Sequence, residues 1–177
     1  RIASILELGA GFQAEMTGKQ NIVLSAAILG LSKEDALAKM ESIIGFSELA
    51  GHIDKPLKTF SSGMLLRLGF SVAIHAEFDI LIIDELLSVG DLLFKRKCFA
   101  KMRQFKEGGK TILLASHNLP DVAAFCDRIL LMDEGRILMD GTVEAVLRQY
   151  WENCEREQNR IVDRLLFSSN REIYGKN

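Results

Sequence analysis

The stretch ILIIDE at residues 80–85 decides the fold, because an apolar run that ends in adjacent carboxylates is typical of a central strand in a parallel sheet. Ligands bind beyond the carboxyl ends of the strands in such sheets. Asp84 is placed there to hold Mg²⁺, directly or through water, and Glu85 is placed to polarise an attacking water molecule. The alternative is that both carboxylates cap the following helix or are solvated.

A second stretch, FSSGM at residues 60–64, opens a helix that we expect over residues 64–76. Small residues at a helix N-terminus expose backbone N–H groups and the positive end of the helix dipole, and both favour an anion. An ordinary N-cap explains Ser61 or Ser62 by itself equally well. The candidate anion-binding residues are Ser61, Ser62, Gly63 and Met64.

Two more polar groups follow the carboxylates. His117 follows a strand expected at residues 112–115, where its ring can hydrogen-bond a γ-phosphate or the attacking water. A structural histidine is the alternative there, and it is our interpretation of His52 and His75. Asp91 ends the turn SVGD, and capping of the next helix is compatible with a functional role at this position.

The rest of the chain alternates between strands and helices. Residues 1–18 read as a strand followed by a glycine-containing turn, and residues 19–59 read as mostly helical, with Ser32 as an N-cap. Apolar spacing over residues 36–44 also favours helix. The elements expected downstream are a crossover helix over 92–105, a short helix over 119–125, a hairpin with strands 129–132 and 136–139, and a helix capped by Thr142.

Composition bounds the functions open to this chain of 177 residues, of which 48% are hydrophobic and 26% are charged. The net charge of -2 implies no bulk attraction to nucleic acid or to anionic lipid. The longest apolar-rich run, residues 22–31, is too short to span a bilayer, so we expect a soluble chain. The 3 widely spaced cysteines indicate free thiols rather than a disulfide framework or a zinc site.

Taken in order, these motifs resemble the second half of an ABC-type ATPase. Residues 60–64 resemble the signature motif of that family, and residues 80–84 resemble Walker B, with Glu85 as the catalytic carboxylate. Residues 88–91 resemble the D-loop, and His117 resembles the switch histidine. The order and the gaps between the motifs match throughout.

A narrower resemblance is to the ATP-binding subunits of polysaccharide exporters of the O-antigen and teichoic-acid type. It is carried by LGAGF at residues 8–12, TGKQNI at 17–22 and ELLSVGD at 85–91. Glu7 lies near the position of the family's Q-loop glutamine and is the candidate for that role, while Gln13 lies several residues later. A short match at the tail resembles the lead into an extra carbohydrate-binding domain, which would make polysaccharide a further partner.

The resemblance implies an α/β fold, namely a P-loop NTPase-like ABC ATPase core with an inserted α-helical subdomain. The implied divisions are residues 1–18 for the end of the core sheet and the Q-loop region, 19–76 for the helical subdomain with the signature motif, 77–155 for the α/β core, and 156–177 for a C-terminal linker.

It also implies a mechanism and partners. Two such subunits pair head to tail as a homodimer, and each ATP, with Mg²⁺ at Asp84, is held between the phosphate loop of one subunit and residues 61–64 of the other. Glu85 directs water at the γ-phosphate and His117 senses it. Closure of the pair moves a transmembrane permease, so the subunit is expected at the cytoplasmic face of the inner membrane.

The sequence lacks one part of this machinery, because no Gly-x-x-x-x-Gly-Lys-Ser/Thr loop occurs in it. We expect the residues given to be a fragment that is inactive by itself; the alternative is a degenerate subunit that works beside an intact partner. Two other functions stay open: a soluble ABC ATPase of DNA repair, chromosome structure or translation, and a non-catalytic interaction module. Long coiled coils or basic extensions, which would favour the soluble ATPases, are not found.

Overall fold

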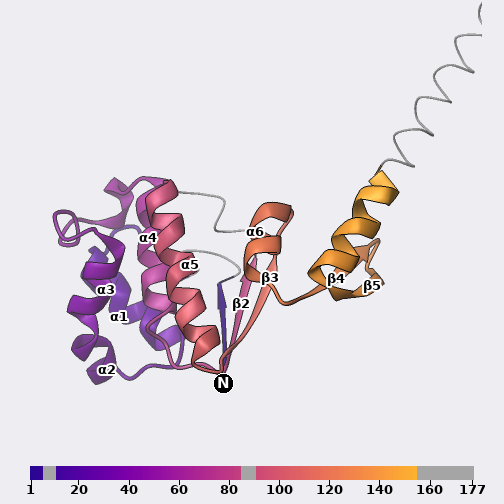
Figure 1. Ribbon diagram of the computed structural model, residues 1–177. Coiled ribbons are helices and arrows are strands. Elements are labelled where there is room, and N and C mark those ends of the chain that lie inside the picture. Colours follow the sequence, from indigo (N-terminus) through magenta and orange to yellow (C-terminus); the bar gives the residue numbers. More distant parts are fainter. Residues whose placement is uncertain (6–10, 85–90, 155–177) are drawn as a thin grey trace, which may run out of the picture. The chain divides into compact units, whose positions relative to one another are not determined.

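The computed structural model describes residues 1–5, 11–84 and 91–154 (Figure 1). The chain divides into two compact units, residues 1–117 and a second unit that begins at Asn118. The first unit contains a parallel sheet and a layer of helices, and the second contains a hairpin and two helices.

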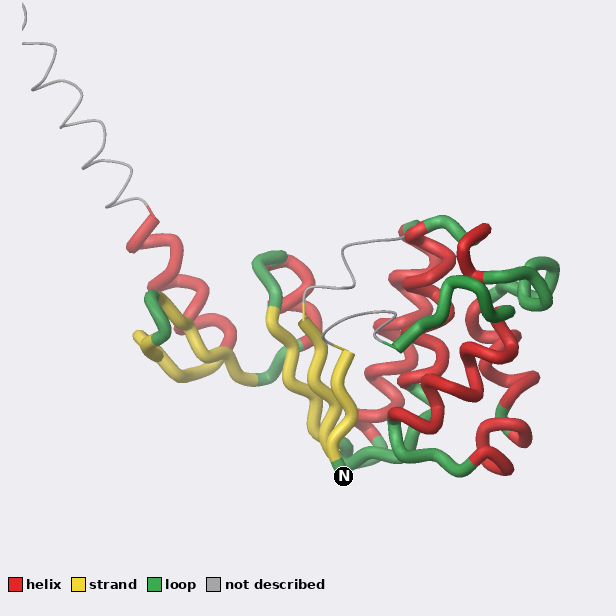
Figure 2. Tube along the Cα trace, turned by 180° about the vertical axis from the view of Figure 1, so that it is seen from behind, coloured by secondary structure: helices red, strands yellow, loops and turns green. Residues whose placement is uncertain are grey.

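The sheet of the first unit has three parallel strands in the order β1 (Ile2–Ile5), β2 (Ile80–Asp84) and β3 (Thr111–Ala115). All helices of this unit lie on one side of the sheet (Figures 1 and 2). Alternate residues of β2 are buried, as the side-chain period of a strand requires when one face is covered. The apolar run of residues 80–83 therefore forms the central strand that the sequence predicts.

The helical layer contains six elements: α1 (Gly18–Ile28), α2 (Lys33–Ala38), α3 (Met40–Ser47), the 3₁₀ turn η1 (Leu57–Thr59), α4 (Ser62–Ala73) and α5 (Leu92–Glu107). Elements α1 to α4 and the 3₁₀ turn contribute to one core cluster that includes Ile22, Ile43 and Leu68. Residues 36–44, whose apolar spacing predicts helix, belong to two helices, because Lys39 is both the C-cap of α2 and the N-cap of α3. The Lys39 Nζ atom donates to the carbonyl oxygen of His75 at 2.9 Å, which ties this junction to the end of α4.

Asn21 organises the loop that leads into α1. The side chain is fully buried, and its amide nitrogen donates to the carbonyl oxygens of Gln13, Met16 and Thr17 at 3.0, 3.1 and 3.0 Å. Its oxygen accepts from the Gln13 N–H at 2.7 Å. Because a buried amide is costly unless its donors and acceptor are paired, this one side chain holds the loop in a single conformation.

The second unit consists of α6 (Leu119–Phe125), the antiparallel strands β4 (Arg128–Asp133) and β5 (Arg136–Thr142), and a helix over residues 143–154. The bounds of α6 agree with the sequence prediction, and the predicted hairpin is present with longer strands, since β5 continues beyond Met139 to Thr142. Thr142 caps the last helix, since its hydroxyl accepts from the Ala145 N–H at 3.4 Å. None of the helices in the described part of the chain has the length and apolar character needed to cross a membrane.

Candidate functional site

Asp84 and His117 lie at the same edge of the sheet. Asp84 is the last residue of β2, and its partner in the register is Ala115, the last residue of β3. His117 follows two residues beyond, and both side chains are exposed. The carboxyl edge thus places a carboxylate and an imidazole on neighbouring strands, as the sequence predicts for polar groups that follow parallel strands.

The N-terminus of α4 is partly open. Ser61 is its N-cap, and the Ser61 hydroxyl accepts from the Met64 N–H at 3.3 Å while its carbonyl accepts from Leu65 at 3.0 Å. Helix geometry leaves the N–H groups of Ser62 and Gly63 at the open end, and no described acceptor is paired with them. Of the two serines that could have capped this helix, Ser61 is the one that does.

The start of α1 is closed by comparison. The N–H groups of Gly18 and Lys19 donate to the carbonyl oxygens of Lys55 and Ile53 at 3.2 and 3.1 Å, respectively. The Thr17 hydroxyl accepts from the third N–H group, that of Gln20. The N–H groups in the first turn of α1 therefore all have acceptors within the protein. The N–H groups of Ser62 and Gly63 in the first turn of α4 have none among the described residues, so they are available to another group.

Gly63 is not required by the packing of the chain itself. A Cβ atom built on Gly63 would meet only the Ser61 Oγ atom, at 3.9 Å, which is an ordinary contact distance. The fold therefore leaves room for a Cβ atom at this position.

Asp91 is the N-cap of α5, so the capping interpretation of this residue is confirmed. Its carboxylate accepts from the Phe94 N–H at 2.9 Å and also forms an ion pair with Arg67 of α4. The Phe94 N–H, and after it the Arg67 guanidinium, hold the pKa of the Asp91 carboxyl below its usual value. Asp91 is thus an anion that joins the start of α5 to the second turn of α4.

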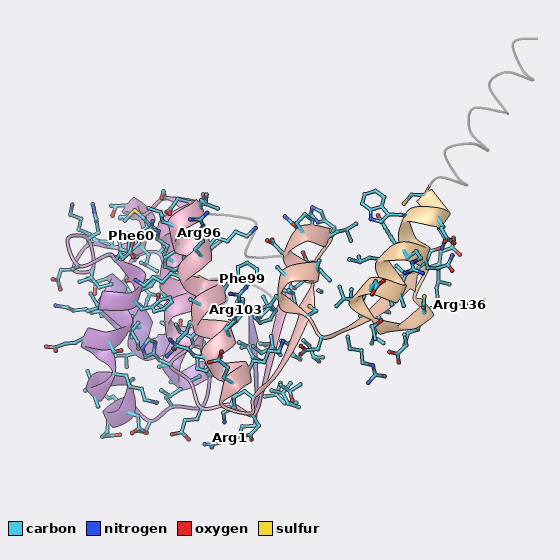
Figure 3. The ribbon with its side chains drawn as sticks, viewed as in Figure 1. Arg1, Phe60, Arg96, Phe99, Arg103 and Arg136 are labelled. Atoms are coloured by element: carbon cyan, nitrogen blue, oxygen red, sulfur yellow. The ribbon has the colours of Figure 1, made fainter. Side chains whose placement is uncertain are left out.

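The starts of α4 and α5 lie at the carboxyl edge of the sheet. α4 precedes β2 and α5 connects β2 to the parallel strand β3, so both helices run back along the strands (Figure 1). Figure 3 shows Phe60, the residue before the Ser61 cap, at that end of the helical layer. The structure therefore brings residues 61–64, Asp84, Asp91 and His117 to the same end of one unit.

Several residues predicted for the site lie outside the described part of the chain, namely Glu7, Glu85 and the first residues of the SVGD turn. The predicted metal ligand, Asp84, lies within the described part of the chain. Its carboxylate is exposed and forms no ion pair with the described residues. No group of three or more metal-ligating side chains occurs among those residues. One carboxylate beside phosphate oxygens and water is the set that Mg²⁺ commonly accepts, so Asp84 fits this ion.

Sequence reasoning missed Arg67. It lies within α4, forms ion pairs with Asp91 and Glu48, and its side chain is only 21% exposed. The signal was available, since Arg67 is the one charged residue in the sequence of α4. A lone charge in an apolar helix indicates a specific partner, because burying an unpaired charge is costly.

Comparison with known proteins gives relatives that match most of this chain. The O-antigen export system ATP-binding protein RfbB of Klebsiella pneumoniae is 49% identical over 150 residues, which cover 85% of this chain. The teichoic acids export ATP-binding protein TagH of Enterococcus faecalis is 46% identical over 147 residues, which cover 83% of this chain. This chain spans 61% of the length of that RfbB and 33% of the length of that TagH. No protein-family model matches the chain.

Solved structures show the same fold. The ATP-binding subunit of an ABC transporter superimposes with a TM-score of 0.73 at 26% identity, over 84% of this chain and 62% of that one. An ATP-binding cassette in a dimeric post-hydrolysis state superimposes with a TM-score of 0.67 at 18% identity, over 81% of this chain and 63% of that one. Over most of its length, the chain is therefore a homologue of the ATP-binding proteins of O-antigen and teichoic acid export systems, with the α/β fold of an ABC ATPase.

Proposed function

We propose that this chain hydrolyses ATP as part of an exporter that moves an O-antigen-like or teichoic-acid-like polysaccharide across the cytoplasmic membrane. The observation that carries the proposal is the polar edge described above, where an open helix start and the groups at two strand ends lie at one end of the unit. The relatives are export proteins, which favours an exporter over a soluble ABC ATPase.

Each residue of the edge has a separate role in this proposal. Asp84 holds Mg²⁺, which neutralises charge on the phosphates when bound. Glu85 accepts the proton of the attacking water, and the His117 imidazole hydrogen-bonds the γ-phosphate. Asp91 keeps α5 in place at the edge, and Glu7 is the candidate for the Q-loop residue.

The first turn of α4 serves a nucleotide held mainly by a second subunit. The N–H groups of Ser62 and Gly63 point out of the unit, the Ser61 cap fixes the turn, and no phosphate loop adjoins it in the sequence. A homodimer in which each chain completes the site of the other follows from this arrangement. The helical region from about Asn21 to Leu66, with the preceding loop, would contact a transmembrane permease at the cytoplasmic face of the membrane.

The test is a mixture of two variants of the full-length chain. Gly63→Asp puts a negative charge where the γ-phosphate of the partner's ATP would lie, while the fold has room for the side chain and an acid is favourable early in a helix. Glu85→Gln removes the base from the other half of the same composite site. We expect each variant alone to be inactive and their equimolar mixture to recover about a quarter of normal ATPase activity, because half of the dimers then contain one intact site.

Gly63→Ala is the matched control for the space at this position, and it should fold with the stability of the unsubstituted chain. ATP binding to the Gly63→Asp monomer should also remain unchanged. A mixture with no more activity than its separate components, or loss of ATP binding by folded Gly63→Asp monomer, would show that residues 61–64 do not act on a partner's nucleotide.

A further inference from the structure

Arg67 lies at the centre of a charge network of which the proposed roles above use only Asp91. Its guanidinium forms ion pairs with Asp91 and with Glu48, and the distance from Nη1 to the Glu48 Oε2 atom is 3.0 Å. Glu48 also accepts from Lys97 Nζ at 2.9 Å, and this nitrogen donates to the Phe46 carbonyl oxygen at 2.9 Å. We refer to Asp91, Arg67, Glu48 and Lys97 as the Arg67 network.

Both cations of the network lie over aromatic rings. The Arg67 Cζ atom is 4.9 Å from the centroid of the Phe94 ring, and the Lys97 Nζ atom is 4.7 Å from that of Phe46. These two rings contact each other edge to face at 5.8 Å, and both also contact Phe70. The network therefore covers an apolar cluster to which α3, α4 and α5 each contribute one ring, and its ion pairs are screened less than those between fully solvated groups.

The network links the start of α5 to the second turn of α4. Arg67 follows the Ser61 cap by less than two turns of α4, or about 9 Å along the axis. Asp91 is the cap of α5. An arginine fork can hold two carboxylates at once in a fixed plane, which a lysine ammonium does not do. One planar guanidinium thus links the second turn of α4 to the cap of α5.

We propose that Arg67 is a positioning residue for ATP hydrolysis, which holds the open start of α4 in register with Asp91 and the carboxyl edge of the sheet. Arg67 does not touch the nucleotide; it acts through Asp91 and Glu48. The inference rests on the proposed function. In that function the start of α4 serves the ATP of the partner subunit, and the carboxyl edge of the sheet serves the ATP of the chain itself. Arg67 controls the spacing between these two parts of the chain.

Three substitutions in the full-length chain separate positioning from mere stability. Arg67→Gln removes both ion pairs, and Arg67→Lys keeps the charge without the fork. Asp91→Asn keeps the cap of α5, since asparagine caps as well as aspartate, and removes the charge that pairs with Arg67. Lys101→Gln is the matched control, because Lys101 also lies over a ring of α5, with its Nζ atom 5.1 Å from the Phe105 centroid, outside the network.

The readout is kcat and KM for ATP, measured well below the melting temperature of each variant. We expect Arg67→Gln and Asp91→Asn each to lower kcat about tenfold or more with KM within about twofold, and the double variant to fall no further than the lower single variant. Arg67→Lys should recover part of the loss, and Lys101→Gln should stay within about twofold of the unsubstituted chain. An unchanged kcat for Arg67→Gln, or losses that multiply in the double variant, would overturn the inference.

Hydrogen exchange on the 177-residue chain tests the coupling independently of ATPase activity. Arg67→Gln should speed exchange of the Phe94 N–H, which Asp91 holds, and of the Met64 N–H at the start of α4, and Lys101→Gln should change neither. An inactive unsubstituted full-length chain would contradict the proposed function alone. Unchanged exchange at both N–H groups in Arg67→Gln would contradict the coupling alone.

Discussion

Gly18 lies so close to Ile53 that a Cβ atom on Gly18 would come within 2.6 Å of the Ile53 Cδ1 atom and 2.9 Å of its carbonyl oxygen. The carbonyl belongs to the backbone that closes the first turn of α1, so it cannot move aside without losing its hydrogen bond from Lys19. We expect Gly18→Ala to lower the free energy of unfolding by about 1–3 kcal/mol in denaturant titrations. Gly45→Ala is the control: nothing lies within 4 Å of that Cβ, and the change should be neutral or stabilising by up to about 1 kcal/mol.

Glu85→Gln in the full-length chain should lower the rate of ATP hydrolysis by about 10²-fold or more, because glutamine keeps the shape of the side chain and cannot accept the proton of water. Equilibrium binding of ATP should be unchanged. Glu107→Gln, at the end of α5 opposite to the Asp91 cap, serves as the control for loss of a surface carboxylate. A nearly normal rate for Glu85→Gln would remove Glu85 from the role of base.

The 177-residue chain by itself should bind Mg-ATP no more tightly than about 1 mM, since no phosphate loop occurs in its sequence to surround the β-phosphate. Isothermal titration calorimetry measures this directly. Saturable binding in the micromolar range would mean that the open start of α4 and the carboxyl edge hold a nucleotide without that loop.

His75 makes stability depend on pH between neutral and mildly acidic conditions. Burial, and after it the nearby Lys101 and Lys39 ammonium groups, hold the pKa of His75 below its ordinary value of 6.5, although the Ser71 carbonyl opposes them. The neutral ring fits the fold, since Nδ1 lies 2.7 Å from the Ser71 oxygen and Nε2 lies 2.8 Å from the hydroxyl of Ser42.

The sign of the effect follows from the lowered pKa. As the pH falls through 6.5, the unfolded chain takes up a proton that the folded chain resists, so the free energy of unfolding decreases toward lower pH and is fully retained above 6.5. Urea titrations between pH 5 and pH 8 should show a smaller decrease in the free energy of unfolding for His75→Gln than for the unsubstituted chain. Equal slopes in the two proteins would contradict this assignment.

The cysteines should differ widely in reactivity. Cys98 is fully buried, and burial raises the pKa of its thiol to about 12, so almost no thiolate forms at pH 8. Cys154 is exposed. Iodoacetamide followed by peptide mapping should modify Cys154 in the native protein and Cys98 only after denaturation, and Cys154→Ser should abolish the fastest phase. Modification of native Cys98 at the rate of Cys154 would show that its helix opens readily.

Local features of the fold could be predicted because their causes lie within a few residues. The caps at Ser61, Asp91 and Thr142 satisfy N–H groups three residues on, so the residue types alone indicate where those helices begin. The central strand and the hairpin follow in the same way from an apolar run and from a turn between two strands. For the site, these local signals predicted that Asp84 ends one strand and that His117 follows the next strand along the chain. The structure shows that these two strands are neighbours.

The sequence by itself therefore determined the elements, their order and the polar residues at their ends. Only the tertiary structure decided which charges pair and which amides are buried, since Arg67 meets Glu48 and Asp91 across three helices, and Asn21 is enclosed by a loop folded back over α1. The physical reason is distance along the chain: a cap needs the energy of one local hydrogen bond, whereas these contacts exist only after packing has brought distant segments together and excluded the water that would otherwise solvate them.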